Sequence, residues 1–278
     1  MHDSSFAKMS AFVDQYLSDR RDSHLEILDF GSQEIGGQPD SSYRNLFDTP
    51  DWVYRGLDMV QGPNVDIVVT DPFSWPSIAD DSIDVVVSGQ VLEHVDYFWI
   101  SVFEIGRVLR PGGIATLIAP SAGPEHRFPR DCWRFYTDGF ESIAGYLGFD
   151  VLDVYTDWGR DTWADSMLVM RKPVWDLESR AEFRRRSAHQ RAARPEGEFV
   201  APGPESVPPV ASVLAGLVGD RLAPILEAQR AAAGLSPSRR PGSAEPLWSR
   251  TKAAVLTLLG PRWSERARAL KKSLQRRA

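Results

Sequence analysis

Residues 25–37 read LEILDFGSQEIGG, and residues 52–58 read WVYRGLD. The first stretch is an apolar run that opens into a turn at Gly31, and the second is an apolar run that ends on Asp58. A glycine after a buried strand lets a ligand approach the backbone closely, and an acidic residue that closes the next strand is placed to accept hydrogen bonds from ribose hydroxyls. The pair predicts a nucleoside-containing cofactor at the carboxyl ends of parallel strands. The alternative is an ordinary Asp-x-Gly turn.

The residues of the first turn distinguish between the cofactors that such a site can hold. Gln33 and Glu34 follow Gly31 and Ser32, so the chain lacks the G-x-G-x-x-G of a dinucleotide site, and no Gly-Lys-Ser/Thr of a P-loop follows. The carboxylate of Glu34 would repel a pyrophosphate, whereas a positively charged sulfonium tolerates it. The turn therefore favours S-adenosylmethionine over NAD.

Two later stretches carry a resemblance to a known family. Residues 83–95 read IDVVVSGQVLEHV and residues 106–121 read GRVLRPGGIATLIAPS. With D-x-G at the first strand, L-E-H-V after the fourth and L-x-P-G-G before the fifth, the chain resembles a class I S-adenosylmethionine-dependent methyltransferase of the methyltransferase type 11-like branch. The resemblance runs from about Ile27 to Lys172 and implies a seven-stranded sheet whose last strand is antiparallel. The chain departs from the family at Gln33, where a second glycine is usual.

The alternation of strand and helix patterns predicts an α/β fold, with a parallel sheet and helices on both faces, and the resemblance implies that this sheet is Rossmann-like and mostly parallel. An amphipathic helix is expected after the capping candidates Ser4 and Ser5. Strands are expected at about 25–30, 52–57, 65–69, 83–88, 113–119, 149–155 and 166–171, and further helices near 43–48, 97–109 and 138–147. A Pro-Gly-Gly turn is expected between the helix near 97–109 and the next strand.

A change in composition divides the chain into residues 1–178, expected to form the methyltransferase domain, and residues 179–278, expected to be a Pro/Arg-rich linker with amphipathic basic helices. Residues 194–209 hold five prolines, and helical patterns follow from 210 to 226 and from 263 to 274. The first part holds 13 Lys/Arg and 30 Asp/Glu, a net charge of −17, whereas the second holds 19 and 8, a net charge of +11. Such asymmetry predicts an acidic catalytic body with a basic appendage.

The composition favours a soluble globular protein, with 42% hydrophobic and 25% charged residues. A single cysteine, Cys132, allows no internal disulfide. The chain shows no signal peptide and no apolar run long enough to span a membrane, so we expect a cytoplasmic protein. The acidic catalytic half would repel phosphates, which argues against nucleic acid as a partner.

The resemblance implies a cofactor cradle built from residues at the strand ends. These residues are Asp29, Gly31, Ser32, Arg44, Asp58, Asp71, Pro72 and Gln90. The residues of the first turn match the part of the family that holds the methionine end, Asp58 matches the ribose ligand, and Asp71-Pro72 matches an adenine contact. Gln90 is expected near the methionine portion and Arg44 near its carboxylate. A surface turn at Asp71-Pro72 and a lone surface arginine at Arg44 are the alternatives.

The segment PEHRFPRDCWRFYTDGF, residues 124–140, follows the fifth strand at the edge where open α/β folds bind ligands. Its mixture of aromatic and charged side chains suits a sugar-like ligand, and the alternative is a helix entry whose aromatic residues merely pack. Its candidate substrate residues are Glu125, Arg127, Trp133, Arg134 and Tyr136. Its candidate catalytic residues are His126, the preferred base, and Asp131. His94 is the second candidate for the base, because a histidine accepts a proton near neutral pH, and helix capping is its alternative role.

These observations predict an S-adenosylmethionine-dependent O-methyltransferase that acts on a sugar hydroxyl of a glycan, glycolipid or glycosylated metabolite. The alternatives are a small-molecule N- or C-methyltransferase and a degenerate, non-catalytic scaffold that binds the cofactor. The loop acids show no fixed ligand spacing, so no metal is predicted. Residues 247–278 pair basic residues with a face bearing Trp263, Leu270 and Leu274, which predicts a peripheral contact with the inner membrane face. The alternative is that this tail packs on its own acidic body or on another protomer of a homo-oligomer.

Overall fold

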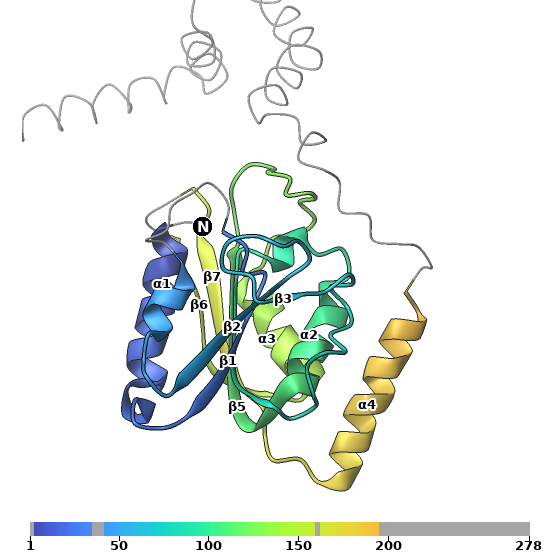
Figure 1. Ribbon diagram of the computed structural model, residues 1–278. Coiled ribbons are helices and arrows are strands. Elements are labelled where there is room, and N and C mark those ends of the chain that lie inside the picture. Colours follow the sequence, from blue (N-terminus) through green and yellow to red (C-terminus); the bar gives the residue numbers. More distant parts are fainter. Residues whose placement is uncertain (1–2, 35–41, 159–161, 195–278) are drawn as a thin grey trace, which may run out of the picture. The chain divides into compact units, whose positions relative to one another are not determined.

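The computed structural model of the chain describes residues 3–34, 42–158 and 162–194. They form a sheet with helices on both faces (Figure 1). The strands are β1 (Leu25–Phe30), β2 (Trp52–Asp58), β3 (Ile67–Val68), β4 (Ile83–Gly89), β5 (Leu109–Pro120), β6 (Asp150–Thr156) and β7 (Asp165–Arg171). The α-helices are α1 (Asp3–Tyr16), α2 (Phe98–Val108), α3 (Thr137–Leu147) and α4 (Leu177–Ala192), and the 3₁₀ helices are η1 (Ser18–Arg20), η3 (Tyr43–Phe47) and η4 (Leu92–His94).

The seven strands lie in the order β3-β2-β1-β4-β5-β7-β6. β7 is antiparallel to both of its neighbours, and the other described strand pairs are parallel. The predicted sheet with an antiparallel last strand is therefore confirmed. The chain order reverses between β1 and β4, and this switch point is where open α/β sheets leave a crevice for ligands at the carboxyl ends of their strands.

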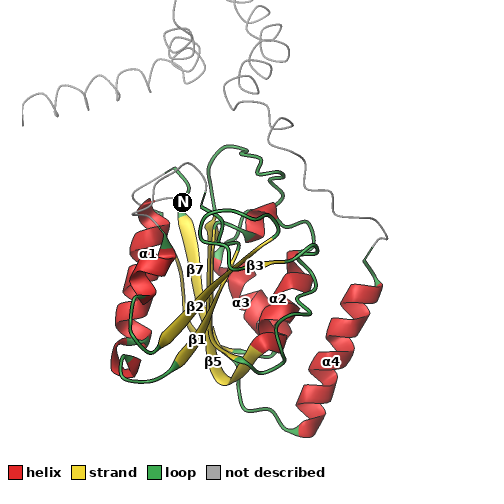
Figure 2. Ribbon diagram, in the orientation of Figure 1, coloured by secondary structure: helices red, strands yellow, loops and turns green. Residues whose placement is uncertain are grey.

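The sheet has an apolar core on each face, because its strands are buried on both sides. Neighbouring residues of β1 point to opposite faces: Ile27 packs with Phe12 of α1, and Leu28 packs in the core that also holds Phe103 of α2. Figure 2 shows α1 on one side of the sheet and α2, α3 and α4 on the other. Each fully buried large apolar side chain contributes about 1.5–3 kcal/mol, so the two cores fix the strand ends on which the site is built.

Helix α4 extends the folded body beyond the predicted boundary at residue 178. The side chain of Asp176 caps the helix by accepting a hydrogen bond from the backbone N–H of Ser179, at 2.7 Å. Phe183, 4% exposed, stands against the ring of Phe103 on α2 at a centroid distance of 5.2 Å. The Arg-rich stretch that was expected to be a linker is thus a docked helix. The chain divides into the units Met1–Val210 and Ala211–Ala278, and the expected helices at 210–226 and 263–274 lie outside the described residues.

Three local expectations are corrected by the structure. Helix α1 already begins at Asp3, so Ser5 does not cap it but is buried inside it and hydrogen-bonds with the Tyr43 hydroxyl at 2.6 Å. The Pro-Gly-Gly stretch is part of β5, where a register shift after Leu109 and a φ of +83° at Gly112 accommodate the extra residues as a bulge. The helix expected near 43–48 is the 3₁₀ helix η3.

Candidate cofactor and substrate site

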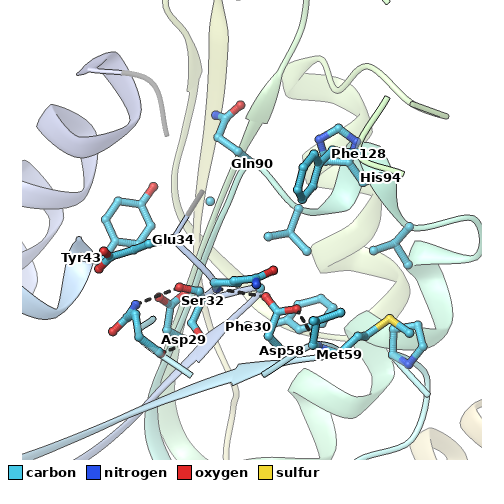
Figure 3. A pocket seen from close by; sticks show the side chains of 18 of the residues that line it. Asp29, Phe30, Ser32, Glu34, Tyr43, Asp58, Met59, Gln90, His94 and Phe128 are labelled. Atoms are coloured by element: carbon cyan, nitrogen blue, oxygen red, sulfur yellow. Dashed lines mark hydrogen bonds between the residues drawn. The ribbon is translucent and has the colours of Figure 1, made fainter. Parts of the chain in front are cut away.

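A pocket of about 210 Å³ opens at the carboxyl ends of β1, β2 and β4 (Figure 3). The residues predicted from the sequence that line it are Asp29, Gly31, Ser32, Asp58, Pro72, Gln90 and His94. It is also lined by residues that the sequence did not single out, among them Tyr43, Met59, Val91, Phe128 and Pro129. In Figure 3, Tyr43 and Glu34 stand on one side of the pocket and His94 and Phe128 on the other. Six of the eight residues predicted for the cradle therefore line one concave site at the switch point of the sheet.

Gly31 gives the first turn its shape. Its φ is +82°, and its backbone N–H donates to the carbonyl of Leu57 at 2.8 Å, which ties the turn to the end of β2. A Cβ atom at this position would stand 2.1 Å from Cγ2 of Val91, far inside van der Waals contact. Glycine is required here both by its backbone conformation and by the close approach of β1 and β4.

Asp58 joins the first turn to the end of β2. Its Oδ2 accepts a hydrogen bond from the backbone N–H of Gln33 at 3.0 Å, and its Oδ1 accepts from the N–H of Met59 at 2.6 Å (Figure 3). The carboxylate lines the pocket, and its remaining lone pairs can accept hydrogen bonds from a ligand. The position and chemistry of Asp58 fit the ribose contact that was predicted for it.

Asp29 is a buried carboxyl group at the floor of the pocket. Its Oδ2 accepts a hydrogen bond from the hydroxyl of Tyr54, and the residue is 3% exposed. Burial raises the pKa of Asp29 to about 7, and Asp58 nearby adds to the rise, while the Tyr54 hydrogen bond and Arg44 oppose it. A protonated Asp29 can donate a hydrogen bond, so near neutral pH this group is both a donor and an acceptor.

Two predicted cofactor residues lie outside the pocket lining. Arg44 donates to Oδ1 of Asn64, which lines the pocket, at 2.7 Å, and its guanidinium also binds Asp66, so Arg44 itself is not among the lining residues and stands behind Asn64. Asp71 accepts from the backbone N–H of Phe73 at 2.9 Å and pairs with Arg194 at 2.7 Å. The carboxylate expected to meet an adenine thus holds the end of α4, and only its neighbour Pro72 lines the pocket.

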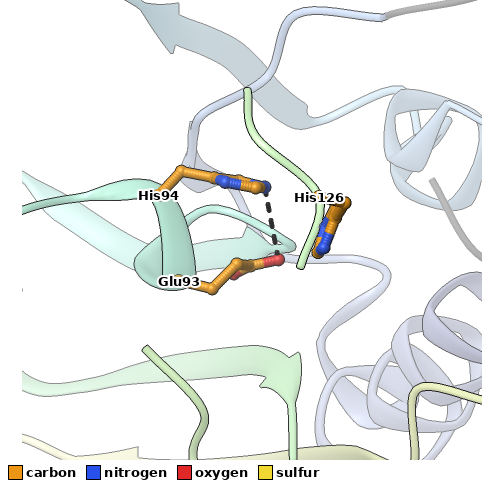
Figure 4. Close-up of side chains that lie close together, drawn as sticks. All are labelled: Glu93, His94 and His126. Atoms are coloured by element: carbon orange, nitrogen blue, oxygen red, sulfur yellow. Dashed lines mark ion pairs between the residues drawn. The ribbon is translucent and has the colours of Figure 1, made fainter. Parts of the chain in front are cut away.

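Glu93 and His94 of η4 meet His126 at the edge of the pocket (Figure 4). The rings of the two histidines have a centroid distance of 4.9 Å, and Nε2 of His94 lies 3.7 Å from Oε1 of Glu93. Nδ1 of His94 contacts the carbonyl oxygen of Arg130, which can only accept, so this nitrogen carries the proton and Nε2 holds the lone pair. The structure thus brings the two predicted base candidates together, but His94 lines the pocket and His126 is not among its lining residues.

The ionisable groups of this cluster are shifted mainly by burial. Burial raises the pKa of Glu93, which is 0% exposed, to about 8, and lowers the pKa of His94 to about 4. Neither carboxylate oxygen of Glu93 accepts a hydrogen bond from the described residues. In the sequence, Glu93 stands out only as part of the L-E-H-V motif. Its burial was not visible there, because it depends on the segment that folds over η4.

Residues 124–136 form a segment that covers η4, and Asp131 and Arg134 hold this covering segment in place. Arg134 donates from both terminal nitrogens to Asp131, at 2.6 and 2.8 Å, and Asp131 also accepts from the backbone N–H of His126 at 2.7 Å. Burial alone would raise the pKa of Asp131, but the hydrogen bonds from Arg134 and His126 outweigh it and lower the pKa. The backbone N–H of Cys132 donates to the carbonyl of Glu93 at 2.7 Å, and this hydrogen bond attaches the segment to η4.

The other predicted substrate residues lie around the outside of this segment. Glu125 and Arg127 form an exposed ion pair. Trp133, 37% exposed, donates its indole N–H to the carbonyl of Val95 at 3.0 Å. Tyr136, 54% exposed, is stacked on Trp158 with a centroid distance of 6.0 Å. The structure therefore supplies exposed aromatic rings near the segment, while Arg134 is engaged in an internal role.

Part of this chain is similar in sequence to known methyltransferases. Residues 51–117, which run from the start of β2 into β5, match a family model described as "Methyltransferase domain". An uncharacterized methyltransferase of Mycobacteroides abscessus is 36% identical over 91 residues, which are 33% of this chain and 32% of that protein. The chain thus spans about a third of the length of the curated relative that it matches.

Two solved structures match this chain at low sequence identity. The 1,6-didemethyltoxoflavin-N1-methyltransferase of Burkholderia thailandensis, solved with S-adenosylhomocysteine, is 16% identical with a TM-score of 0.47, and the alignment covers 62% of this chain and 79% of the other. The [4+2]-cyclase SpnF is 19% identical with a TM-score of 0.46, and the alignment covers 61% and 81%. The segment that matches the methyltransferase model contains Asp58, Gln90 and His94, which the strand order brings to the pocket.

No described helix combines the length and the apolar character that crossing a bilayer requires. Residues 247–278, for which a membrane contact is predicted, lie outside the described part of the chain.

Proposed function

We propose that this protein is an S-adenosylmethionine-dependent O-methyltransferase that acts on a hydroxyl group of a sugar. The observation that carries the proposal is the pocket at the switch point of the sheet, where Gly31 and Asp58 stand at the ends of β1 and β2 and His94 stands at the opposite wall. Methyl transfer requires an acceptor oxygen in line with the methyl carbon and the sulfur, so positioning is the main task of the protein.

The acceptor would enter from the side of the covering segment, residues 124–136. Its proton must leave during the transfer, because a sugar hydroxyl is not ionised at neutral pH. The cluster of Glu93, His94 and His126 adjoins the pocket through His94 and offers groups that could accept this proton. Tyr136 and Trp158 stack on each other outside the lining of the pocket, and the exposed side of this pair supports a carbohydrate acceptor, because the apolar face of a sugar ring packs on aromatic side chains.

Calorimetry with S-adenosylmethionine, S-adenosylhomocysteine and NAD tests the cofactor part of the proposal. We expect the first two to bind and NAD to remain unbound. A protein that binds NAD, or none of the three, would contradict it. Incubation with labelled S-adenosylmethionine and a panel of free sugars, glycosides and amines, followed by mass spectrometry of the products, tests the acceptor. Methylated amines or carbon acids would favour an N- or C-methyltransferase, and cofactor binding without any product would favour the non-catalytic scaffold.

We also propose that residues 247–278 bind an anionic membrane surface and bring the enzyme to a lipid-linked glycan. Residues 248–278 contain nine Lys/Arg and one acidic residue, and each basic residue near an anionic surface contributes about 1 kcal/mol. Full-length protein should co-sediment with vesicles of anionic lipid at low salt, and protein truncated after residue 245 should not. If both forms stay in the supernatant at every salt concentration, the tail packs on its own body or on another protomer, and the membrane proposal fails.

A further inference from the structure

The cluster of Glu93, His94 and His126 has the composition and the arrangement of a metal site. Each residue offers one ligand atom, and the three atoms lie within 4.8 Å of one another (Figure 4). Two imidazoles and one carboxylate are the protein ligands of many zinc sites that keep an open position for catalysis. We propose that these three residues bind a divalent transition-metal ion, with Zn²⁺ as the representative case, beside the cofactor pocket.

The buried carboxylate of Glu93 is the first independent support for this site. Glu93 is 0% exposed, and neither of its oxygens accepts a hydrogen bond from the described residues. A buried polar group without a partner costs about 1–3 kcal/mol, and more for a charged group, so such groups in folded proteins call for an explanation. A metal ion bound between Glu93 and the two imidazoles would give the carboxylate the partner that it lacks.

The surroundings of the two histidines are the second support. A histidine that binds a metal commonly directs its other ring nitrogen at a backbone carbonyl or a carboxylate, which fixes its orientation. Nδ1 of His94 contacts the carbonyl of Arg130, which leaves the lone pair on Nε2, the nitrogen that faces Glu93. Nδ1 of His126 lies 3.4 Å from a carboxylate oxygen of Asp131, whose position is in turn fixed by Arg134.

The acidic groups around the cluster also favour a cation. Asp131 and Asp165 act on Glu93 together with one guanidinium, that of Arg134. A carboxyl group buried beside other acids gains from a cationic partner, because an unpaired charge is costly in a medium of low dielectric constant.

Only small movements are needed to close the site around an ion. Bonds of 2.0–2.1 Å in a tetrahedral site place neighbouring ligand atoms about 3.3 Å apart. The distance from Nε2 of His94 to Oε1 of Glu93 is already 3.7 Å, and the widest separation in the cluster is below 4.8 Å. Shifts of about 1 Å, within the range of side-chain torsions, would bring all three ligands to bonding distance.

The role of the ion in the reaction rests on the proposed function. His94 lines the pocket, so the open coordination position lies at the wall where the acceptor hydroxyl would stand. Coordination lowers the pKa of a hydroxyl, so its proton can pass to solvent water. The oxygen then forms a bond to the methyl carbon as the carbon–sulfur bond breaks, and the sulfur of S-adenosylhomocysteine leaves with the electron pair.

Metal binding is tested directly on the full-length protein, stripped with a chelator and dialysed against Zn²⁺ alone. Metal content measured by mass spectrometry should be one zinc per chain for the wild type. Glu93→Gln and His126→Ala should each lower the affinity at least 100-fold. Asp131→Asn, which alters only a positioning residue, should lower it by about 10–100-fold. His24→Ala is the matched control: His24 also contacts a glutamate, with Nε2 3.1 Å from Oε1 of Glu26, but on the exposed surface, so zinc binding should be unchanged.

Circular dichroism and thermal unfolding of the metal-free variants verify that each is folded, and His126→Ala, at a partly exposed side chain, replaces Glu93→Gln if that variant does not fold. Zinc should raise the unfolding temperature of the wild type and of His24→Ala but not that of the ligand variants. A wild type that retains no zinc, or ligand variants that bind as tightly as His24→Ala, would overturn the site. Zinc binding without S-adenosylmethionine binding would leave the metal site standing and reject the proposed function, and the reverse result would reject the metal site alone.

Discussion

Gly31 at the end of β1 lies so close to Val91 after β4 that a Cβ on Gly31 would stand 2.1 Å from Cγ2 of Val91. This contact brings the two strand ends together at the pocket, since both residues line it. Gly112 has nearly the same φ, +83° against +82°, but a Cβ there would meet nothing within 4 Å. Substitution of Gly112 therefore tests the cost of a positive φ alone, and substitution of Gly31 tests the cost of a positive φ together with steric overlap.

We predict that Gly112→Ala lowers the free energy of unfolding by about 1–2 kcal/mol, the cost of a left-handed conformation for a residue with a Cβ. Gly31→Ala should lower it further and should also weaken S-adenosylmethionine binding, because the overlap forces β1 and β4 apart at the pocket. Urea unfolding and calorimetry measure both effects. The double variant Gly31→Ala/Val91→Ala should recover part of the stability. Equal losses for the two glycine variants would show that the overlap is relieved without consequence.

Asp58→Ala should weaken the binding of S-adenosylmethionine by roughly 1–3 kcal/mol, the range for a lost hydrogen bond to a charged group. Part of the loss is expected to come from the first turn, since Asp58 also accepts the N–H of Gln33. Calorimetry gives the affinity. Asp51→Ala, in the exposed turn just before β2, is the control and should bind as the wild type does. An unchanged affinity of Asp58→Ala would place the ribose elsewhere.

Asp29→Asn should change how stability depends on pH. The pKa of Asp29 is raised by burial from 3.8 to about 7, so the folded state holds a proton that the unfolded state releases between these values. This contribution to stability is therefore greatest at low pH and is lost as pH rises from about 4 to about 7, at about 1.4 kcal/mol per pKa unit. Tyr54, Asp58 and Arg44 are the titratable groups that face Asp29.

An asparagine at position 29 carries no such proton and can still accept the hydrogen bond from Tyr54. The difference in unfolding free energy between variant and wild type should move in favour of the variant between pH 4 and pH 8, as measured by urea unfolding in a pH series. A difference that stays constant across this range would show that Asp29 titrates normally in the fold.

Phe183→Ala should lower the free energy of unfolding by about 3–5 kcal/mol, because its ring is buried against Phe103 in the core between α4 and α2. Leu177→Ala on the same helix is the control: Leu177 is 88% exposed, so the change should stay within about 0.5 kcal/mol. Urea unfolding of the full-length variants measures both. Similar values for the two would mean that α4 is an appendage and that the boundary at 178 holds.

Much of the fold could be predicted from the sequence because buried parallel strands appear as short apolar runs. The runs that end at Phe30 and Asp58 are local patterns, and the residues that follow them must lie at one edge of the sheet. The Pro-Gly-Gly stretch was predicted to be a turn because its composition is typical of one. Leu109 and Ile114 on either side of it pair with β4, and Gly112 and Gly113 hydrogen-bond with Lys172 just after β7, so its place in a bulged strand comes from neighbours that are distant in the sequence.

The site was predictable where a residue's role depends on its place at a strand end, and less so where it depends on a distant partner. Asp71 forms an ion pair with Arg194, which lies 123 positions later, and no local sequence pattern predicts this pairing. The burial of Glu93 likewise arises because Cys132 and Trp133 bind its carbonyl from another segment. Sequence patterns identified the histidines as candidates, but only the fold shows that they converge on a buried acid.

The contact between Arg194 and Asp71 has a consequence for the 84 residues that follow it. It fixes the last described residue of the chain beside Pro72, which lines the pocket. The residues that follow are covalently tethered to a point near this rim, so a molecule bound by them would meet the pocket in an intramolecular encounter. The effective concentration of such a molecule at the pocket would depend on the length of the tether.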